Sequence, residues 1–342
     1  MADGYPPREA AICISFGPMA DAQESSASFA AITSGVVSML GAPHVRVDEL
    51  SERGARAAFL GFPFDGANAA IERPGSANGP RGLRVASNMC FPWSFEWDID
   101  LFEAYDLVDC GDAPLAIGNA VRTHELVQEA LELMLAAGTI PIAVGGDHSL
   151  CIPGARALSR HLGPQRRMGY LQIDAHLDAG TEIGGERQTN CNGLIRATEL
   201  DNVSVENMAV IGVRGTINVP DWWEAVRERS IPVYPMSILK RGGVEETVSG
   251  VLDRVWDGVD AVYVTFDTDS IDSAFAPGTT GPEPGGFSSH EIIRIGQMVG
   301  ERGVTAIDNV ELCPVYDPSG ITARLVWEVL SQMLYAHAKH HL

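Results

Sequence analysis

The chain has 342 residues, and 24 Lys and Arg against 45 Asp and Glu give it a formal net charge of −21. Nucleic acids and anionic membranes bind basic surfaces, so this balance excludes both as expected partners. It favours cationic small molecules, although it also serves solubility. Hydrophobic residues make up 45% of the chain, enough for a sizeable core, and no apolar run reaches the roughly 18 residues of a membrane span.

The N-terminus and the cysteines both indicate a cytoplasmic protein. The first ten residues, MADGYPPREA, contain no basic segment that leads into a long apolar run, so we expect no secretory signal. The cysteines form no Cys-x-x-Cys pair and no short-spaced framework, which favours reduced thiols in the cytoplasm.

Residues 1–45 form an N-terminal arm rich in Ala, Ser and Gly, which we expect to be partly irregular and to wrap a neighbouring subunit. No linker, repeat or shift in composition divides residues 46–342, so we predict one domain there.

Strand and helix patterns alternate through that domain. Short apolar runs predict buried strands at 57–62, 139–146, 168–176, 208–215, 260–269 and 304–312. Apolar residues at helical spacing predict helices at 123–138, 222–230, 290–302 and 321–338. Buried strands that alternate with amphipathic helices indicate an α/β fold, with a parallel sheet covered on both faces.

Polar residues follow three of the apolar runs. They lie in GGDHS (145–149), DAHLD (174–178) and DTD (267–269). Ligands of such sheets sit beyond the carboxyl ends of the strands, so these three segments predict a common site. Within GGDHS we assign Asp147 a capping role for the next helix, and His148 the ligand role.

The ligand types in these segments point to metal. If strand geometry persists, Asp174, His176 and Asp178 project to one side, and Asp267 and Asp269 do likewise. With His148, two imidazoles and four carboxylates converge, which is more negative charge than a protein buries without cations. This set suits divalent first-row metals, and two ions about 4 Å apart would acidify a shared water into a hydroxide nucleophile. A set of structural carboxylates is the alternative that we consider weaker.

Several segments resemble the ureohydrolase family, which includes arginases and agmatinases. Its signatures are similar to GGDHS, DAHLD and FDTDSIDSAFAPG (266–278), and the likeness extends to RPGSANGP (73–80) and IDNVELCPVYD (307–317). The resemblance implies a three-layer, arginase-like α/β/α fold with a central, mainly parallel sheet of about eight strands. It also implies a dinuclear site, usually with Mn²⁺, that hydrolyses a guanidino group, typically to urea and an amine.

The resemblance assigns ligands by motif. It gives the first ion His148, Asp174, Asp178 and Asp267, and the second ion His176, Asp174, Asp267 and Asp269, so that Asp174 and Asp267 bridge. Glu311 in NVELCP matches the carboxylate that pairs with the substrate guanidinium, a planar cation suited to two parallel hydrogen bonds.

The chain departs from the family at Asn192-Gly193, where relatives carry His-Gly with a histidine assigned to substrate contact or proton transfer. Asparagine cannot titrate near pH 7. We therefore expect Asp178 to protonate the leaving amine, with Glu182 and a water relay as weaker candidates, and Asn192 to act in substrate recognition.

Two other departures also concern the substrate. Gly281 lacks a threonine hydroxyl that relatives often have, and Ala77 stands where arginine is frequent, after a loop (66–72) that is two residues longer than usual. They disfavour arginase-like amino-acid specificity and leave agmatine, other guanidino-alkanes, free guanidine or a biguanide such as metformin. The guanidine and biguanide branches are associated with Ni²⁺.

A metal-binding but catalytically silent subunit of a hetero-oligomer is the alternative function, since Asn192 and Gly281 alter an otherwise intact frame. A deacetylase-type amidohydrolase is less favoured, because such sites generally use one Zn²⁺. The resemblance implies a trimer or hexamer, either of one chain or, as in biguanide hydrolases, of two related subunits.

Overall fold

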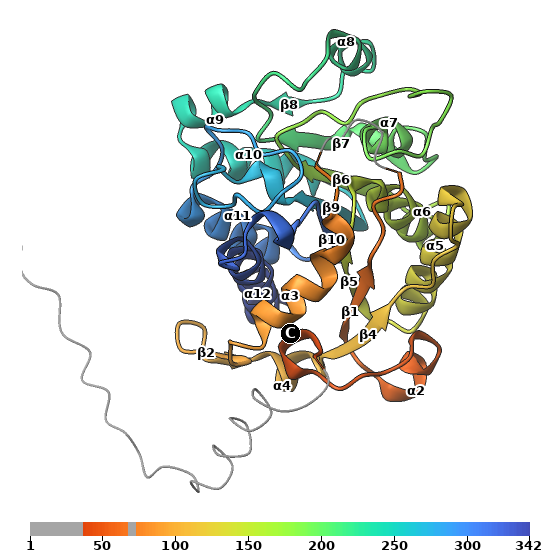
Figure 1. Cartoon of the computed structure of the whole chain (residues 1–342), viewed down its shortest axis with the longest axis vertical. Coiled ribbons are helices and arrows are strands. Elements are labelled where there is room, and N and C mark those ends of the chain that lie inside the picture. The colour runs from red at the N-terminus through yellow and green to blue at the C-terminus, as the bar shows by residue number, and fades with distance from the viewer. Residues whose placement is uncertain (1–36, 68–72) are drawn as a thin grey trace, which may run out of the picture. The chain divides into compact units, whose positions relative to one another are not determined.

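The computed structural model of the chain describes residues 37–67 and 73–342 (Figure 1). Most of the predicted arm, and residues 68–72 of the loop thought to be longer than usual, lie outside the described residues. The division of the chain at residue 45 therefore stays a prediction.

Eight parallel strands form the central sheet, in the order β4-β1-β5-β10-β9-β6-β7-β8. This confirms the predicted arginase-like α/β fold. A separate antiparallel pair joins β2 to β3. The strands are β1 Ala57–Phe62, β2 Trp93–Ser94, β3 Ile99–Asp100, β4 Val108–Asp112, β5 Ile140–Gly145, β6 Met168–Ile173, β7 Val203–Ile211, β8 Val233–Tyr234, β9 Ala261–Asp267 and β10 Ala306–Val310.

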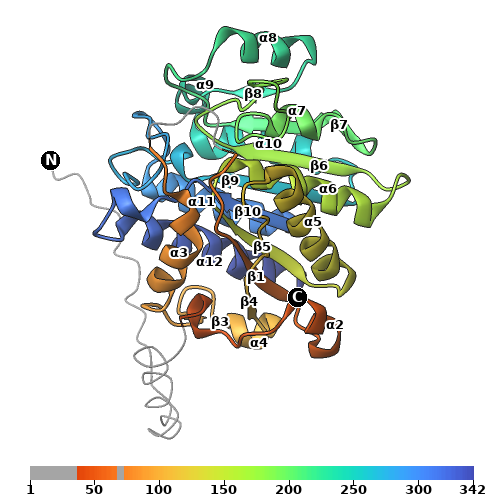
Figure 2. The same ribbon diagram turned by 45° about the vertical axis from the view of Figure 1, so that its right-hand side comes forward.

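Helices cover both faces of this sheet (Figures 1 and 2). The α-helices are α2 Leu50–Arg53, α3 Gly79–Ser87, α4 Leu101–Tyr105, α5 Ala120–Ala136, α6 Cys151–Leu162, α7 Gly193–Ala197, α8 Pro220–Glu228, α9 Met236–Gly242, α10 Val244–Val255, α11 Ser289–Arg302 and α12 Ile321–His341. Short 3-10 turns are η1 Met39–Gly41, η2 Val47–Glu49, η3 Ser76–Asn78, η4 His148–Leu150, η5 Thr268–Ser270 and η6 Pro314–Tyr316. Within the described ranges, no helix is both long and apolar enough to cross a membrane.

Alternate residues of each central strand enter two separate cores. In β1, Phe59 packs with α3, α11 and α12 on one face, whereas Leu60 and Phe62 pack with α5 and α6 on the other. Both faces of the sheet are buried, so the central strands need nearly continuous apolar runs. This explains why those runs predicted them.

The structure corrects two details of the predicted strands. β7 begins at Val203, five residues before the predicted start. The prediction missed residues 203–207 because polar residues alternate with valines there and the segment is partly exposed, so it lacks a continuous apolar run. Strand β6 ends at Ile173, so Asp174 and the predicted ligands after it lie in an irregular segment and not on a strand. The edge strands β4 and β8 were not predicted, since β4 is rich in aspartate and β8 has two residues.

Candidate metal centre

The predicted ligands meet at the carboxyl end of four neighbouring strands, β5, β10, β9 and β6. His148 follows β5, Asp267 ends β9, and Asp174 follows β6. This is the edge at which ligands bind in open α/β sheets. The structure thus brings together three segments, the first and last of which are more than 100 residues apart in the sequence.

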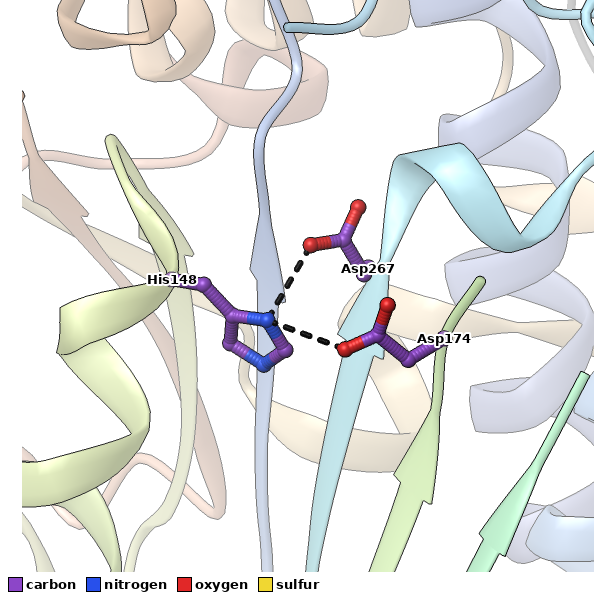
Figure 3. A group of neighbouring side chains, drawn as sticks. All are labelled: His148, Asp174 and Asp267. Atoms are coloured by element: carbon purple, nitrogen blue, oxygen red, sulfur yellow. Dashed lines mark ion pairs between the residues drawn. The ribbon is translucent and has the colours of Figure 1, made fainter. Parts of the chain in front are cut away.

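His148 lies among three carboxylates. Its Nδ1 atom is 2.9 Å from Asp178 Oδ2, 3.1 Å from Asp267 Oδ2 and 3.2 Å from Asp174 Oδ2. Figure 3 shows Asp174 and Asp267 pointing at this one nitrogen. The atom is buried, yet none of these contacts has hydrogen-bond geometry. Three anionic oxygens around one imidazole nitrogen are the arrangement expected of ligands to a shared cation, so the residues fit a divalent metal.

A second group of ligands shares Asp174 with the first. His176 Nδ1 is 2.9 Å from Asp269 Oδ2 and 3.8 Å from Asp174 Oδ1. The ligand atoms of His176, Asp174 and Asp269 lie within 4.8 Å of one another, as do those of His148, Asp174 and Asp267. Because Asp174 directs one oxygen to each group, the geometry suits two adjacent ions.

Two identical local turns, and not strand alternation, aim these side chains. Asp174 Oδ1 accepts the His176 N–H at 2.6 Å, and Asp267 Oδ1 accepts the Asp269 N–H at 2.8 Å. In each turn an aspartate bonds the backbone two residues later. Asp269 Oδ1 also accepts the Ala175 N–H at 3.1 Å, which ties the two turns together.

Burial and mutual repulsion make this group of carboxylates costly without cations. Burial, with the charges of Asp178 and Asp269, raises the pKa of Asp174 to about 6. Burial and two neighbouring aspartates also raise the pKa of Asp267 well above its usual value. Burial disfavours a charged His176, but Asp269, Asp174 and Asp178 together outweigh it and raise the pKa of that imidazole to about 10. Bound cations would relieve the repulsion.

Metal-free protein is expected to lose stability as pH rises from about 5 to 8. Asp174 has its pKa raised to about 6, and Glu311 has its pKa raised to about 8. The folded state therefore keeps protons that the unfolded state releases, and rising pH favours unfolding. His176, whose pKa is also raised, acts in the same direction.

In EDTA, the melting temperature is expected to fall by at least about 5 °C between pH 5.5 and pH 8, and saturating Mn²⁺ should remove most of that fall. Differential scanning fluorimetry measures both curves. The Glu311→Gln variant in EDTA should show a shallower slope, since it lacks one of the titrating groups. A melting temperature in EDTA that is flat or rises with pH contradicts this account.

Glu311 adjoins the ligand groups through hydrogen bonds. Its Oε1 accepts the His148 N–H at 2.8 Å, and its Oε2 accepts the Thr280 hydroxyl at 2.5 Å. Burial, with the charge of Asp147, raises the pKa of Glu311 to about 8. Both Glu311 and Asp178 have positive φ, 59° and 45°, which is uncommon outside glycine and typical of functional sites.

A cavity of about 360 Å³ opens onto these groups. Its wall combines candidate ligands with apolar side chains and one arginine, and consists of Arg73, His176, Asp178, Asn190, Cys191, Ile217, Trp222, Asp267, Asp269, Thr280, Gly281, Pro282 and Glu311. Arg73 was not predicted from the sequence, although it lies in the same motif, RPGSANGP, as Ala77. The Arg73 guanidinium lies 3.9 Å from the centre of the Tyr316 ring and donates to Thr279 O at 3.3 Å.

Other residues singled out in the sequence have structural contacts. Asp147 caps η4, as predicted, by accepting the Ser149 N–H at 3.1 Å. Asn192 is fully buried; its Nδ2 donates to Gly180 O at 2.7 Å, and its Oδ1 accepts the Thr189 N–H at 2.9 Å. From this segment, Asn190 and Cys191 line the cavity. The predicted role of Asn192 in the reaction stays a prediction, and its contacts are those of a residue that shapes the loop.

Gly281 allows a close approach to the second ligand group. A Cβ atom at this position would lie 2.8 Å from His176 Cε1 and 3.1 Å from Asp269 Oδ2. Gly281→Ala is therefore expected to displace His176 and weaken divalent metal binding by at least about 10-fold, because small shifts of site groups are costly. Calorimetric metal titration measures this. Gly250→Ala, where a Cβ meets nothing within 4 Å, is the matched control, and equal affinity in both variants would contradict the prediction.

The chain matches the arginase family over residues 55–335. Proclavaminate amidinohydrolase of Streptomyces clavuligerus is 30% identical over 289 residues, which are 84% of this chain and 90% of that protein. An agmatinase of Escherichia coli is 32% identical over 280 residues, covering 81% and 86% of the two chains.

Human mitochondrial guanidino acid hydrolase is 31% identical over 317 residues, covering 93% of this chain and 87% of that protein. The solved structure of the Streptomyces clavuligerus proclavaminate amidinohydrolase superposes with a TM-score of 0.82 at 28% identity, covering 91% of this chain and 99% of that one. The predicted ureohydrolase resemblance is thereby confirmed: this chain belongs to the arginase family, a family of hydrolases that act on C–N bonds.

Proposed function

We propose that this chain is a dinuclear metal-dependent hydrolase that cleaves a C–N bond of a guanidino or biguanide compound. The observation that carries the proposal is that Asp174 belongs to both groups of candidate ligands. These groups adjoin a cavity whose wall includes Glu311. His148, Asp174, His176, Asp178, Asp267 and Asp269 would hold two divalent ions. When bound, such ions lower the pKa of water, so that hydroxide becomes available near neutral pH.

The chain's own residues bind the substrate and move the proton. Glu311 faces the cavity beside the ligands, where its carboxylate would pair with the substrate guanidinium and orient its central carbon. Asp178 lines the cavity, and its Oδ2 atom is 2.9 Å from His148 Nδ1. This carboxylate would take a proton from the attacking water and return it to the leaving amine.

The wall of the cavity bears on the substrate tail. Ile217 and Trp222 offer apolar contact, whereas the Arg73 guanidinium adds a positive charge to the wall. Relatives are named for agmatine, guanidinobutyrate and proclavaminate, so the tails of this family differ in charge. We propose agmatine, another guanidino-alkane, free guanidine or a biguanide as the substrate. The metal would be Mn²⁺ by default, or Ni²⁺ if the substrate is guanidine or a biguanide. We further propose that the chain assembles into a trimer or hexamer, either alone or with a related subunit.

A panel assay tests the proposal. Purified full-length chain is stripped of metal, loaded with Mn²⁺ or Ni²⁺, and supplied with agmatine, 4-guanidinobutyrate, guanidine, arginine and metformin. Release of urea, guanylurea, ammonia and amines is followed by mass spectrometry. We expect turnover of at least one of these compounds. This turnover should disappear in EDTA and return when metal is added. Turnover of none, with two ions bound per chain, would contradict the hydrolase and favour the silent subunit.

A further inference from the structure

A carboxylate is buried in the sheet beneath the candidate metal centre. Asp308 on β10 is fully buried, and burying a charge without partners is costly. Its Oδ1 accepts the Thr265 hydroxyl at 2.6 Å, and its Oδ2 accepts the Tyr263 hydroxyl. Thr265 and Asp308 are register partners on the adjacent strands β9 and β10. The catalytic roles proposed above leave this carboxylate without a function.

Thr265 connects Asp308 to a candidate ligand. His148 Nε2 lies 2.9 Å from Thr265 Oγ1, while Nδ1 of the same ring faces the three aspartates of its ligand group. A ring nitrogen that binds a cation needs its lone pair, so the proton must lie on the other nitrogen. An ionised carboxylate can only accept, so Thr265 must give its single proton to Asp308. The Thr265 oxygen is then an acceptor toward His148.

We propose that Asp308 is a positioning residue that acts through Thr265 to hold His148 in the tautomer whose Nδ1 is free to bind a divalent cation. The hydrogen-bond directions run from His148 Nε2–H to Thr265 Oγ1, and from the Thr265 hydroxyl to Asp308. This inference rests on the proposed metal centre. It adds Thr265 and Asp308 to the candidate ligand His148, and we term these three residues the β9–β10 relay.

The packing around Tyr263 supports the relay. A Cβ atom at Gly154 on helix α6 would lie 1.9 Å from the Tyr263 hydroxyl oxygen, so glycine is required there for that hydroxyl to fit. Tyr263, Thr265 and Asp267 alternate along β9 and project to the same side of the sheet. One face of β9 therefore carries three groups in a row. They are the Tyr263 hydroxyl, which bonds Asp308, the relay hydroxyl of Thr265, and the candidate metal ligand Asp267.

Thr265→Val tests the relay, because it removes the hydroxyl and nearly keeps the volume. Its affinity for Mn²⁺ is expected to fall about 10- to 100-fold at one of two sites, the usual effect of losing a partner behind a metal ligand. Calorimetric titration and Mn²⁺ electron paramagnetic resonance measure affinity and stoichiometry without substrate. Thr265→Ser should restore affinity to within a few-fold of the wild type. Thr139→Val, which removes a buried hydroxyl bonded to Ala55 O at 2.7 Å far from the centre, is the matched control.

Asp308→Asn is the second arm. Its amide can donate as well as accept, so Thr265 loses its fixed direction, and we expect Mn²⁺ affinity to fall by about 10-fold. The double variant with Thr265→Val should bind as Thr265→Val does, since the carboxylate acts through that hydroxyl. Should Asp308→Asn not fold by circular dichroism, the valine, serine and control variants decide.

The outcomes separate the relay from the metal centre on which it rests. A wild-type chain that binds no divalent cation would overturn both. Normal Mn²⁺ affinity in Thr265→Val, or losses that simply add in the double variant, would overturn the relay alone. An affinity loss as large in Thr139→Val would also overturn it, because the effect would then follow from lower stability.

Discussion

The Asp174→Asn variant is expected to lose bound divalent metal and at least about 10³-fold in kcat/KM, since metal ions supply several kcal/mol of stabilisation to such reactions. Asp174 is the carboxylate that belongs to both ligand groups. Asparagine keeps its size and one oxygen but removes a negative charge that each ion would share. The Gln172 amide, which donates to Asp174 Oδ2 at 2.7 Å, would then face an amide in place of a carboxylate.

The measurement is metal content per chain by mass spectrometry after dialysis, together with kinetics on the substrate found by the panel. Asp253→Asn is the matched control, because this carboxylate is 67% exposed and pairs with Arg302 on the surface. It should keep full metal content and activity. An Asp174→Asn variant with two tightly bound ions would show that this carboxylate does not bridge.

The Glu311→Gln variant should retain its metal and lose about 10²- to 10³-fold in kcat/KM, because breaking a buried charge pair costs about 3–5 kcal/mol. Glutamine keeps an oxygen for the His148 N–H, which Glu311 Oε1 accepts at 2.8 Å. It removes the charge that would pair with the substrate guanidinium. Since Thr280 donates to the other oxygen at 2.5 Å, the amide will also disturb that hydroxyl.

Here metal content is the internal control, and Glu245→Gln, whose side chain is 64% exposed and paired with Arg294, is the matched surface variant. Unchanged kcat/KM in Glu311→Gln would remove this residue from substrate binding. Loss of metal together with activity would instead assign Glu311 to support of His148.

The sequence predicted the central strands and pointed to the segments that meet at the candidate site, because both signals depend on local physical requirements. A strand buried on two faces must be apolar throughout, as in Ala57–Phe62. Buried carboxylates and imidazoles at strand ends are costly without cations. Strand β8, with two residues, and the polar start of β7 carried no comparable signal.

By itself, then, the sequence determined the α/β class, the three segments that carry the candidate ligands, and the family resemblance. Only the tertiary structure decided how the side chains are aimed. The positive φ of Asp178 and Glu311, the loop contacts of Asn192 and the place of Arg73 in the cavity wall follow from contacts between distant segments. Periodicity reports which face of an element is buried, whereas the direction of a side chain beyond a strand end depends on hydrogen bonds that form only once the sheet is assembled.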